Sequence, residues 1–140
     1  MTASGTFEEA LALAQEGDST RVDMLVRDIY GGAYEQFNLS ATTVASSFGK
    51  MAQGSAEDVS KSDLAKAALI MVTNNIGSIV QLHARLEGVT RVIFAGNFLE
   101  NNDIAMRTLA FALEFWSQGK VLALFLEHIG YSGAVGALIS

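Results

Sequence analysis

Residues 91–102, RVIFAGNFLENN, join a short apolar run to the start of a helix. The run at 92–94 consists of β-forming side chains followed by Gly96, a pattern typical of a buried strand that ends at a turn. Two asparagines and an aspartate at 101–103 offer caps to the next helix. Ligands gather beyond the carboxyl ends of strands in open α/β sheets, so this junction is a candidate nucleotide site. The same pattern also occurs in folds that bind nothing there.

The other periodic segments predict alternating helices and strands. Thr6 and Glu9 form a capping-box pattern, and Gly17 ends the helix that they begin. Residues 40–47 are small and polar and predict a loop or a short helical turn. Helices are expected at 6–17, 60–87 and 103–117, and strands at 21–30, 92–94 and 121–126. This order predicts an α/β layered domain.

An asparagine interrupts the apolar stripe of the longest predicted helix. The stripe repeats every three or four residues and consists of Leu64, Ala68, Met71, Asn75, Ile79, Leu82 and Leu86. A buried amide without a partner costs about 1–3 kcal/mol, so Asn75 needs a backbone partner, a facing subunit or a ligand. The competing interpretation is a core amide whose hydrogen bonds are satisfied.

Composition excludes several classes of function. The chain has 140 residues with 50% hydrophobic content, which suits one core, and no cysteine, which excludes disulfides and thiolate metal sites. A net charge of −6 argues against a nucleic-acid partner. No apolar run approaches the roughly 20 residues needed to span a bilayer, and no signal-like segment begins the chain. We therefore expect a cytoplasmic protein with no membrane partner.

The residues that often bind metals are sparse. His83 and His128 are too far apart in sequence to form a spaced metal pair. Asp23 and Asp28 flank an apolar run and offer carboxylates to a cation, although isolated surface charges are the simpler interpretation. Spacing alone therefore supports an α/β domain associated with a nucleotide, and no metal site is predicted.

Six motifs stand in a fixed order along the chain. They are VDMLVRDIYGG at 22–32, VASSFGK at 44–50, NNIGSI at 74–79, AGNFL at 95–99, FWSQGK at 115–120 and FLEHIGYSGAVGAL at 125–138. From about Thr6 onward this order resembles that of the eukaryotic-type (type II) pantothenate kinases. The resemblance implies an actin-like, sugar-kinase-like (ASKHA) fold, in which each lobe is a three-layer arrangement of a sheet with packed helices. It also implies transfer of the ATP γ-phosphate to pantothenate, the first step of coenzyme A biosynthesis.

The resemblance further implies that residues 1–140 are the C-terminal lobe of such a kinase domain, without its N-terminal lobe. The phosphate-binding turn and the general base of the family belong to that other lobe. No catalytic residue is therefore expected in this chain, which should be inactive alone. ATP and Mg²⁺ would be bound mainly by the absent lobe. Family members are homodimers that acetyl-coenzyme A inhibits at the pantothenate site.

Site residues follow from the same resemblance. Gly96 and Asn97 would face the adenosine of ATP. Asn74, Asn75 and Gly77 would lie near the nucleotide or on a helix that faces the second subunit.

A pocket for pantothenate and acyl-coenzyme A is also implied, partly from the opposite subunit. Core packing is the competing interpretation for its tryptophan, which lies in a helical apolar stripe. The implied pocket residues are Tyr30, Tyr34, Val44, Ala45 and Trp116.

Two positions depart from the family pattern. Glu100 stands where many relatives have arginine, and Gln81 stands where many have a basic residue. The loss of two cations should weaken attraction for the phosphates of coenzyme A. These departures favour the alternative hypothesis, a non-catalytic, kinase-like module for dimerisation or ligand binding.

Overall fold

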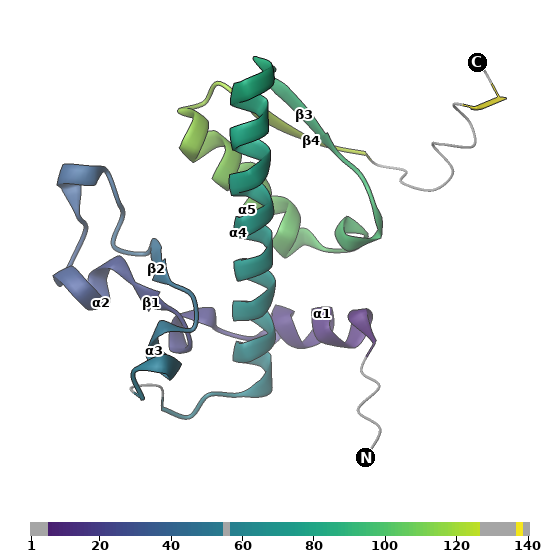
Figure 1. Cartoon of the computed structure of the whole chain (residues 1–140). Coiled ribbons are helices and arrows are strands. Elements are labelled where there is room, and N and C mark those ends of the chain that lie inside the picture. Colours follow the sequence, from purple (N-terminus) through teal and green to yellow (C-terminus); the bar gives the residue numbers. More distant parts are fainter. Residues whose placement is uncertain (1–5, 55–56, 127–136, 139–140) are drawn as a thin grey trace. The chain divides into compact units, whose positions relative to one another are not determined.

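The structure is a computed structural model that describes residues 6–54, 57–126 and 137–138. Its helices and strands, shown in Figure 1, are α1 (Phe7–Glu16), β1 (Met24–Leu25), α2 (Val26–Tyr30), β2 (Val44–Ser46), α3 (Gly49–Ala52), α4 (Lys61–Glu87), β3 (Arg91–Phe94), α5 (Asp103–Ser117) and β4 (Leu122–Phe125). Short 3₁₀ turns cover Ser19–Arg21, Glu35–Phe37 and Asn97–Leu99. The mixture of helices and small sheets confirms the α/β class.

The chain divides into two compact units, Met1–Met71 and Val72–Ser140, and α4 contributes residues to both. In the first unit, the predicted capping box of α1 is confirmed. The Glu9 amide donates to Thr6 Oγ1 at 3.3 Å, and the Thr6 amide donates to Glu9 Oε2 at 3.1 Å. Gly17 follows as the C-terminal cap.

The exit from α1 is tied to the start of α4 by hydrogen bonds. Asp63 is buried, and its carboxylate accepts from the amides of Asp18 at 2.7 Å and Ser60 at 2.9 Å. These bonds, that from Asp18 first, lower the pKa of Asp63 below its ordinary value. Lys66 Nζ donates to the Gly17 carbonyl at 2.8 Å. These hydrogen bonds therefore hold the segment after α1 against the first turns of α4; this connection is called the α1–α4 joint below.

The strand predicted at 21–30 is wrong for most of its length. Only β1 is extended, and α2 begins directly after it. The Leu25 amide donates to Asp28 Oδ2 at 2.8 Å, so a local helix cap overrides the strand preference of the β-branched residues. Gly31 then ends α2 with a φ of 77°.

A short antiparallel sheet completes the first unit. β1 pairs with β2 through Met24↔Ser46 and Leu25↔Val44. The predicted loop at 40–47 is therefore partly a strand.

The second unit contains a parallel β–α–β arrangement. β3 and β4 pair in register from Arg91↔Leu122 to Phe94↔Phe125, and α5 connects them. Figure 1 shows the two strands side by side. The strands predicted at 92–94 and 121–126 and the helix at 103–117 are confirmed within one residue. The buried core of this unit consists of Ala84, Phe94, Leu99, Ala105, Leu109, Leu113 and Val121.

The buried face of α4 within this unit differs from the predicted stripe. Small or β-branched residues at positions 73, 77, 80 and 84 are buried or partly buried, whereas Asn75, Ile79 and Leu82 are exposed. Gly77 lies close to α5: a Cβ at this position would be 3.1 Å from the Ala112 Cβ. Close approach of the helices favours the small residues over the larger apolar ones. The expectation of a buried Asn75 is therefore wrong.

One face of the β3–β4 sheet remains apolar and exposed. Alternate residues on the other face, including Phe94, pack into the core, and the Phe94 and Phe125 rings stack with centroids 5.5 Å apart. The exposed face carries Ile93, Leu122 and Leu124. Parallel sheets are usually covered on both faces, so this face is unusual for an isolated unit.

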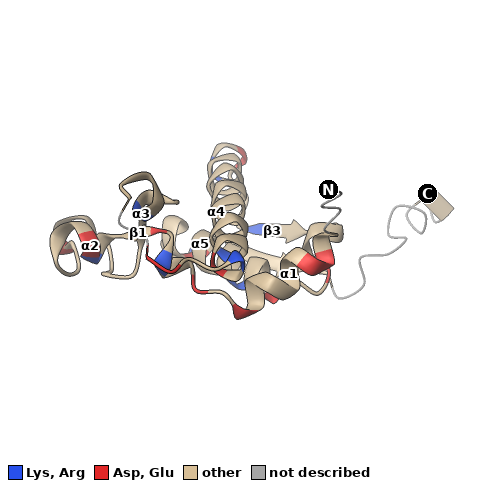
Figure 2. Ribbon diagram, turned by 90° about the horizontal axis from the view of Figure 1, so that it is seen from below, with Lys and Arg blue, Asp and Glu red and all other residues tan. Residues whose placement is uncertain are grey.

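Charges are scattered over the described elements. Figure 2 shows basic residues interspersed with acidic ones, without a basic stripe on a described helix. Among the described helices, none combines the length and apolar character of a membrane-crossing segment.

Candidate functional site

The predicted nucleotide junction is a tight turn after β3. Gly96 has a φ of 124° and a ψ of 159°, a conformation that other residues rarely adopt. A Cβ at Gly96 would meet no described heavy atom within 4 Å. The backbone conformation, rather than crowding, therefore requires glycine here, and the space beside it is open.

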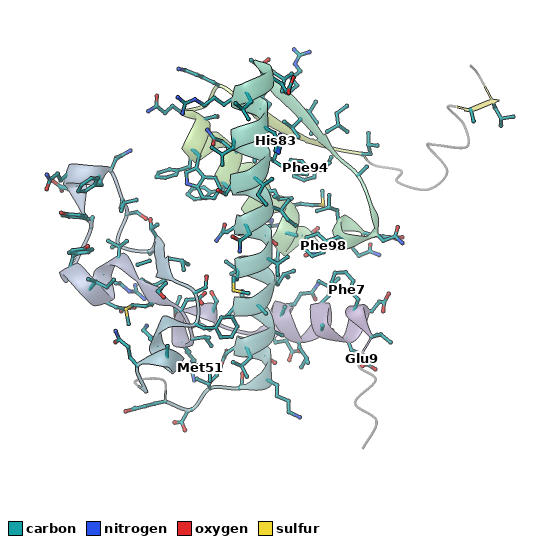
Figure 3. The ribbon with its side chains drawn as sticks, in the orientation of Figure 1. Phe7, Glu9, Met51, His83, Phe94 and Phe98 are labelled. Atoms are coloured by element: carbon teal, nitrogen blue, oxygen red, sulfur yellow. The ribbon has the colours of Figure 1, made fainter. Side chains whose placement is uncertain are left out.

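Residues 96–99, called the Gly96 turn below, are held from the core side. The Leu99 amide donates to the Gly96 carbonyl at 3.0 Å, and the Leu99 side chain is buried in the core. Phe98 packs against the same core, and Figure 3 shows it in the turn that follows Phe94 on β3. Asn97 is exposed. The turn thus has an anchored side and an accessible side.

Asn102 connects this turn to α5. Its Oδ1 accepts from the Ala105 amide at 3.0 Å and caps the helix, as the sequence predicts. Its Nδ2 also donates to the Phe98 carbonyl at 2.8 Å. Sequence reasoning missed this second bond, since an N-cap pattern does not indicate what the amide nitrogen contacts.

Three aromatic residues in the first unit form an aromatic platform: Tyr30, Tyr34 and Phe37. The Tyr30 and Tyr34 rings stack at 4.4 Å with planes 11° apart, and the Phe37 ring lies 5.1 Å from that of Tyr34. Tyr30 and Phe37 are largely exposed. Sequence reasoning missed Phe37, although the spacing of four and three residues was a usable signal.

The remaining pocket residues lie on β2 and α5. Val44 is partly buried and pairs with Leu25, whereas Ala45 is exposed. Trp116 belongs to the second unit and is 40% exposed. A Cβ at Gly77 would be 3.4 Å from Trp116 Cζ3, so the indole lies against α4 without being part of the buried core. The structure thus brings Tyr30 and Tyr34 together, and places Val44 and Ala45 in the same unit.

The residues of the NNIGSI motif have three different environments on α4. Asn74 is partly buried, Asn75 is exposed, and Gly77 is buried against α5. Gly77 has a packing role in this structure, and the nucleotide role of the three residues remains a prediction.

The carboxylates of Asp23 and Asp28 lie near a lysine. Lys50 Nζ is 2.9 Å from Asp28 Oδ2 and donates to the Thr20 carbonyl at 2.7 Å. This ammonium and the Leu25 amide lower the pKa of Asp28, the amide having the larger effect. Lys50 of the same chain thus supplies the positive charge beside Asp28.

Asp23 is not the surface charge that its sequence context suggests, because it is only 1% exposed. Its Oδ1 accepts from the Phe48 amide at 2.8 Å, while its Oδ2 has no hydrogen-bond partner in the described part of the chain. Burial raises the pKa of Asp23, although the Phe48 amide and Lys50 act in the opposite direction.

The histidines do not form a site in the described structure. His83 is exposed, and Figure 3 shows it on α4. Glu127 and His128 lie outside the described residues. In the described ranges, no three metal-binding side chains gather at one place.

Comparisons with known proteins match the whole chain. A family model described as Fumble covers residues 1–140. The chain is 47% identical over 139 residues to the mouse protein 4'-phosphopantetheine phosphatase, covering 99% of this chain and 17% of that protein. It is 42% identical over 143 residues to the pantothenate kinase of Schizosaccharomyces pombe, covering 99% of this chain and 36% of that protein. It is 43% identical over 143 residues to pantothenate kinase 2 of Arabidopsis thaliana, covering 100% of this chain and 16% of that protein. The chain therefore spans between 16% and 36% of the length of these relatives.

Proposed function

The chain belongs to the Fumble family, and from this premise we propose that it is the C-terminal lobe of a pantothenate kinase domain. The whole enzyme would transfer a phosphoryl group from ATP to pantothenate and begin coenzyme A biosynthesis in the cytoplasm. The observation that carries this proposal is the agreement over nearly the entire chain with relatives named pantothenate kinase, at 42–44% identity.

The Gly96 turn supports an ATP role for this lobe. It lies at the carboxyl end of a parallel strand, where α/β sheets commonly receive ligands, and the space beside Gly96 is open. We assign Gly96 and Asn97 to the adenosine of ATP. Mg²⁺ is assigned mainly to the other lobe.

The exposed sheet face supports the proposed fold. An actin-like lobe has helices on both faces of its sheet, and the face with Ile93, Leu122 and Leu124 offers an apolar surface for such a layer. In the proposed enzyme this face is covered and the sheet has further strands.

The aromatic platform supports a pocket for pantothenate and acyl-coenzyme A. Tyr30 is exposed and stacks on the partly buried Tyr34, and a tyrosine presents an apolar ring with a polar hydroxyl, which suits a ligand that is part amide and part hydrocarbon. We propose that Tyr30, Tyr34, Val44, Ala45 and Trp116 line this pocket, partly from the opposite subunit of a homodimer. Acyl-coenzyme A is proposed to inhibit the enzyme by occupying it.

The homodimer is proposed to form through the exposed stripe of α4, which contains Ile79, Leu82 and Leu86. Ile79→Glu is expected to shift a dimer to a monomer in sedimentation velocity at about 20 μM, because a charge in an apolar interface is costly to desolvate. Met51→Glu is the control, since Met51 lies on α3, outside α4, and is 44% exposed against 57% for Ile79. A wild-type chain that sediments only as a monomer up to high micromolar concentration would reject this interface.

A second candidate function has its own support. The mouse relative is named 4'-phosphopantetheine phosphatase, so this module also occurs in a protein named for another activity. Glu100 is exposed and directly follows the Gly96 turn, where it places a negative charge. The alternative is therefore a non-catalytic, kinase-like module for dimerisation or ligand binding.

Activity measurements separate the two candidates. The purified chain is expected to phosphorylate no pantothenate, because the proposed base and phosphate-binding turn lie elsewhere. A chimera that joins the preceding part of the S. pombe pantothenate kinase to residues 1–140 is expected to form phosphopantothenate. Turnover by the isolated chain would contradict the proposal that the base and the phosphate-binding turn lie in the other lobe. A folded but inactive chimera would favour the non-catalytic alternative.

A further inference from the structure

We propose that Asn102 is a positioning residue that holds the Gly96 turn in the form that receives the nucleotide. The inference rests on the proposed nucleotide role of Gly96 and Asn97. Asn102 itself is 1% exposed, so it acts through the turn rather than by touching a ligand.

The carbonyl groups of the Gly96 turn are all engaged in hydrogen bonds. Those of residues 96 and 97 accept from backbone amides three residues further along, at 3.0 and 3.2 Å. The Leu99 carbonyl accepts from the Asn102 amide at 3.2 Å, and the Phe98 carbonyl accepts from the Asn102 side chain at 2.8 Å. Asn102 thus holds the second half of the turn through both its backbone and its side chain.

The same side chain fixes the turn to a rigid element. Its Oδ1 accepts from the Ala105 amide at 3.0 Å in the first turn of α5, whose Leu109 and Leu113 are buried in the core. One planar amide therefore joins the turn to the helix, with a donor at one end and an acceptor at the other. A displacement of this amide changes the path of the backbone toward Gly96.

The chemistry of asparagine gives a sharp test. Aspartate is as good an N-cap as asparagine, but an ionised carboxylate has no donor for the Phe98 carbonyl. Asn102→Asp therefore keeps the cap and removes the bond to the turn. Asn102→Ser is the second variant, because it is uncharged, retains a cap oxygen and has too short a side chain to hold both partners. Thr108→Val is the matched control, since it removes another side-chain hydrogen bond of α5, to the Ile104 carbonyl at 2.7 Å.

The experiment first records amide NMR spectra of the 140-residue chain without nucleotide. The titration with Mg-ATP then uses the chimera that carries the preceding part of the S. pombe pantothenate kinase, because ATP and Mg²⁺ are assigned mainly to the other lobe. In both Asn102 variants we expect the Gly96 and Asn97 amide signals to shift without nucleotide. We expect affinity for Mg-ATP to fall about fivefold, consistent with losing part of one buried hydrogen bond. Thr108→Val should leave both measurements unchanged.

The outcomes separate this inference from the proposed function. In the wild-type chimera, Gly96 and Asn97 signals that do not respond to Mg-ATP would reject the nucleotide assignment, while the nucleotide-free spectra would still test Asn102. Folded Asn102 variants with unshifted Gly96 and Asn97 signals would overturn the positioning role. If the wild-type chimera binds Mg-ATP, unchanged affinity in chimeras that carry either Asn102 variant would overturn it as well.

Discussion

Gly17→Ala is expected to lower the free energy of unfolding by about 3 kcal/mol, at the upper end of typical overpacking costs. An added Cβ would overlap the Ser62 carbonyl oxygen and carbonyl carbon and lie 2.9 Å from the Asp63 amide nitrogen. These are backbone atoms, so no side chain can rotate away. Lys66 and Asp63 also tie the two segments together by hydrogen bonds, which restricts relaxation of the α1–α4 joint. Urea unfolding followed by circular dichroism measures the change.

Gly32→Ala is the matched control for this prediction. A Cβ at Gly32 would meet no described atom within 4 Å. Alanine should therefore leave the free energy of unfolding unchanged or raise it by up to about 1 kcal/mol, because alanine lowers the conformational entropy of the unfolded chain. Equal unfolding midpoints for the two variants would show that the α1–α4 joint relaxes freely. That result would contradict the packing argument.

The sequence predicts those elements whose boundaries have local causes. The capping box at Thr6 and the N-cap at Asn102 each satisfy backbone amides within a few residues, and the helices begin there. The strand prediction at 21–30 fails for the same physical reason. Asp28 caps a helix that the β-branched pattern does not indicate, because one hydrogen bond outweighs a weak strand preference.

The buried face of α4 could not be predicted from periodicity alone. Two stripes on this helix have helical spacing, one with large apolar residues and one with small residues that includes Gly77. Which stripe is buried depends on how closely α5 approaches, and the sequence of α4 does not contain that information. The exposed stripe then becomes a candidate surface for a second subunit.

The candidate site is only partly readable from sequence. The Gly96 turn follows from a strand, a glycine and helix caps in succession, and its positive φ confirms why glycine is needed. The stacking of Tyr30 on Tyr34 depends on the path of the chain after α2. The family resemblance implies a shared pocket for these two residues and does not imply that their rings stack. The burial of Asp23 has no local sequence signal, since long-range contacts with the Phe48 amide create it.

Ala45→Phe is expected to reduce inhibition by acetyl-coenzyme A at least about tenfold in the active chimera, a loss of about 1.4 kcal/mol in binding. Ala45 is exposed on β2, in the unit that carries the aromatic platform. A phenylalanine at an exposed position does not overpack a core, so the melting temperature should stay nearly unchanged. In the proposed pocket the same ring would fill space that the acyl or pantetheine portion of the inhibitor needs.

The measurement compares inhibition curves for acetyl-coenzyme A with the Michaelis constant for ATP. The ATP constant should be nearly unchanged, because the proposed adenosine contacts lie in the Gly96 turn. Thr42→Phe serves as the control, since Thr42 is also exposed and precedes β2 outside the proposed pocket. Equal loss of inhibition in both variants would point to a general effect of an added aromatic ring. If acetyl-coenzyme A inhibits the Ala45→Phe variant as strongly as the unsubstituted chimera, the pocket assignment is rejected, because the phenylalanine on β2 would then face no ligand.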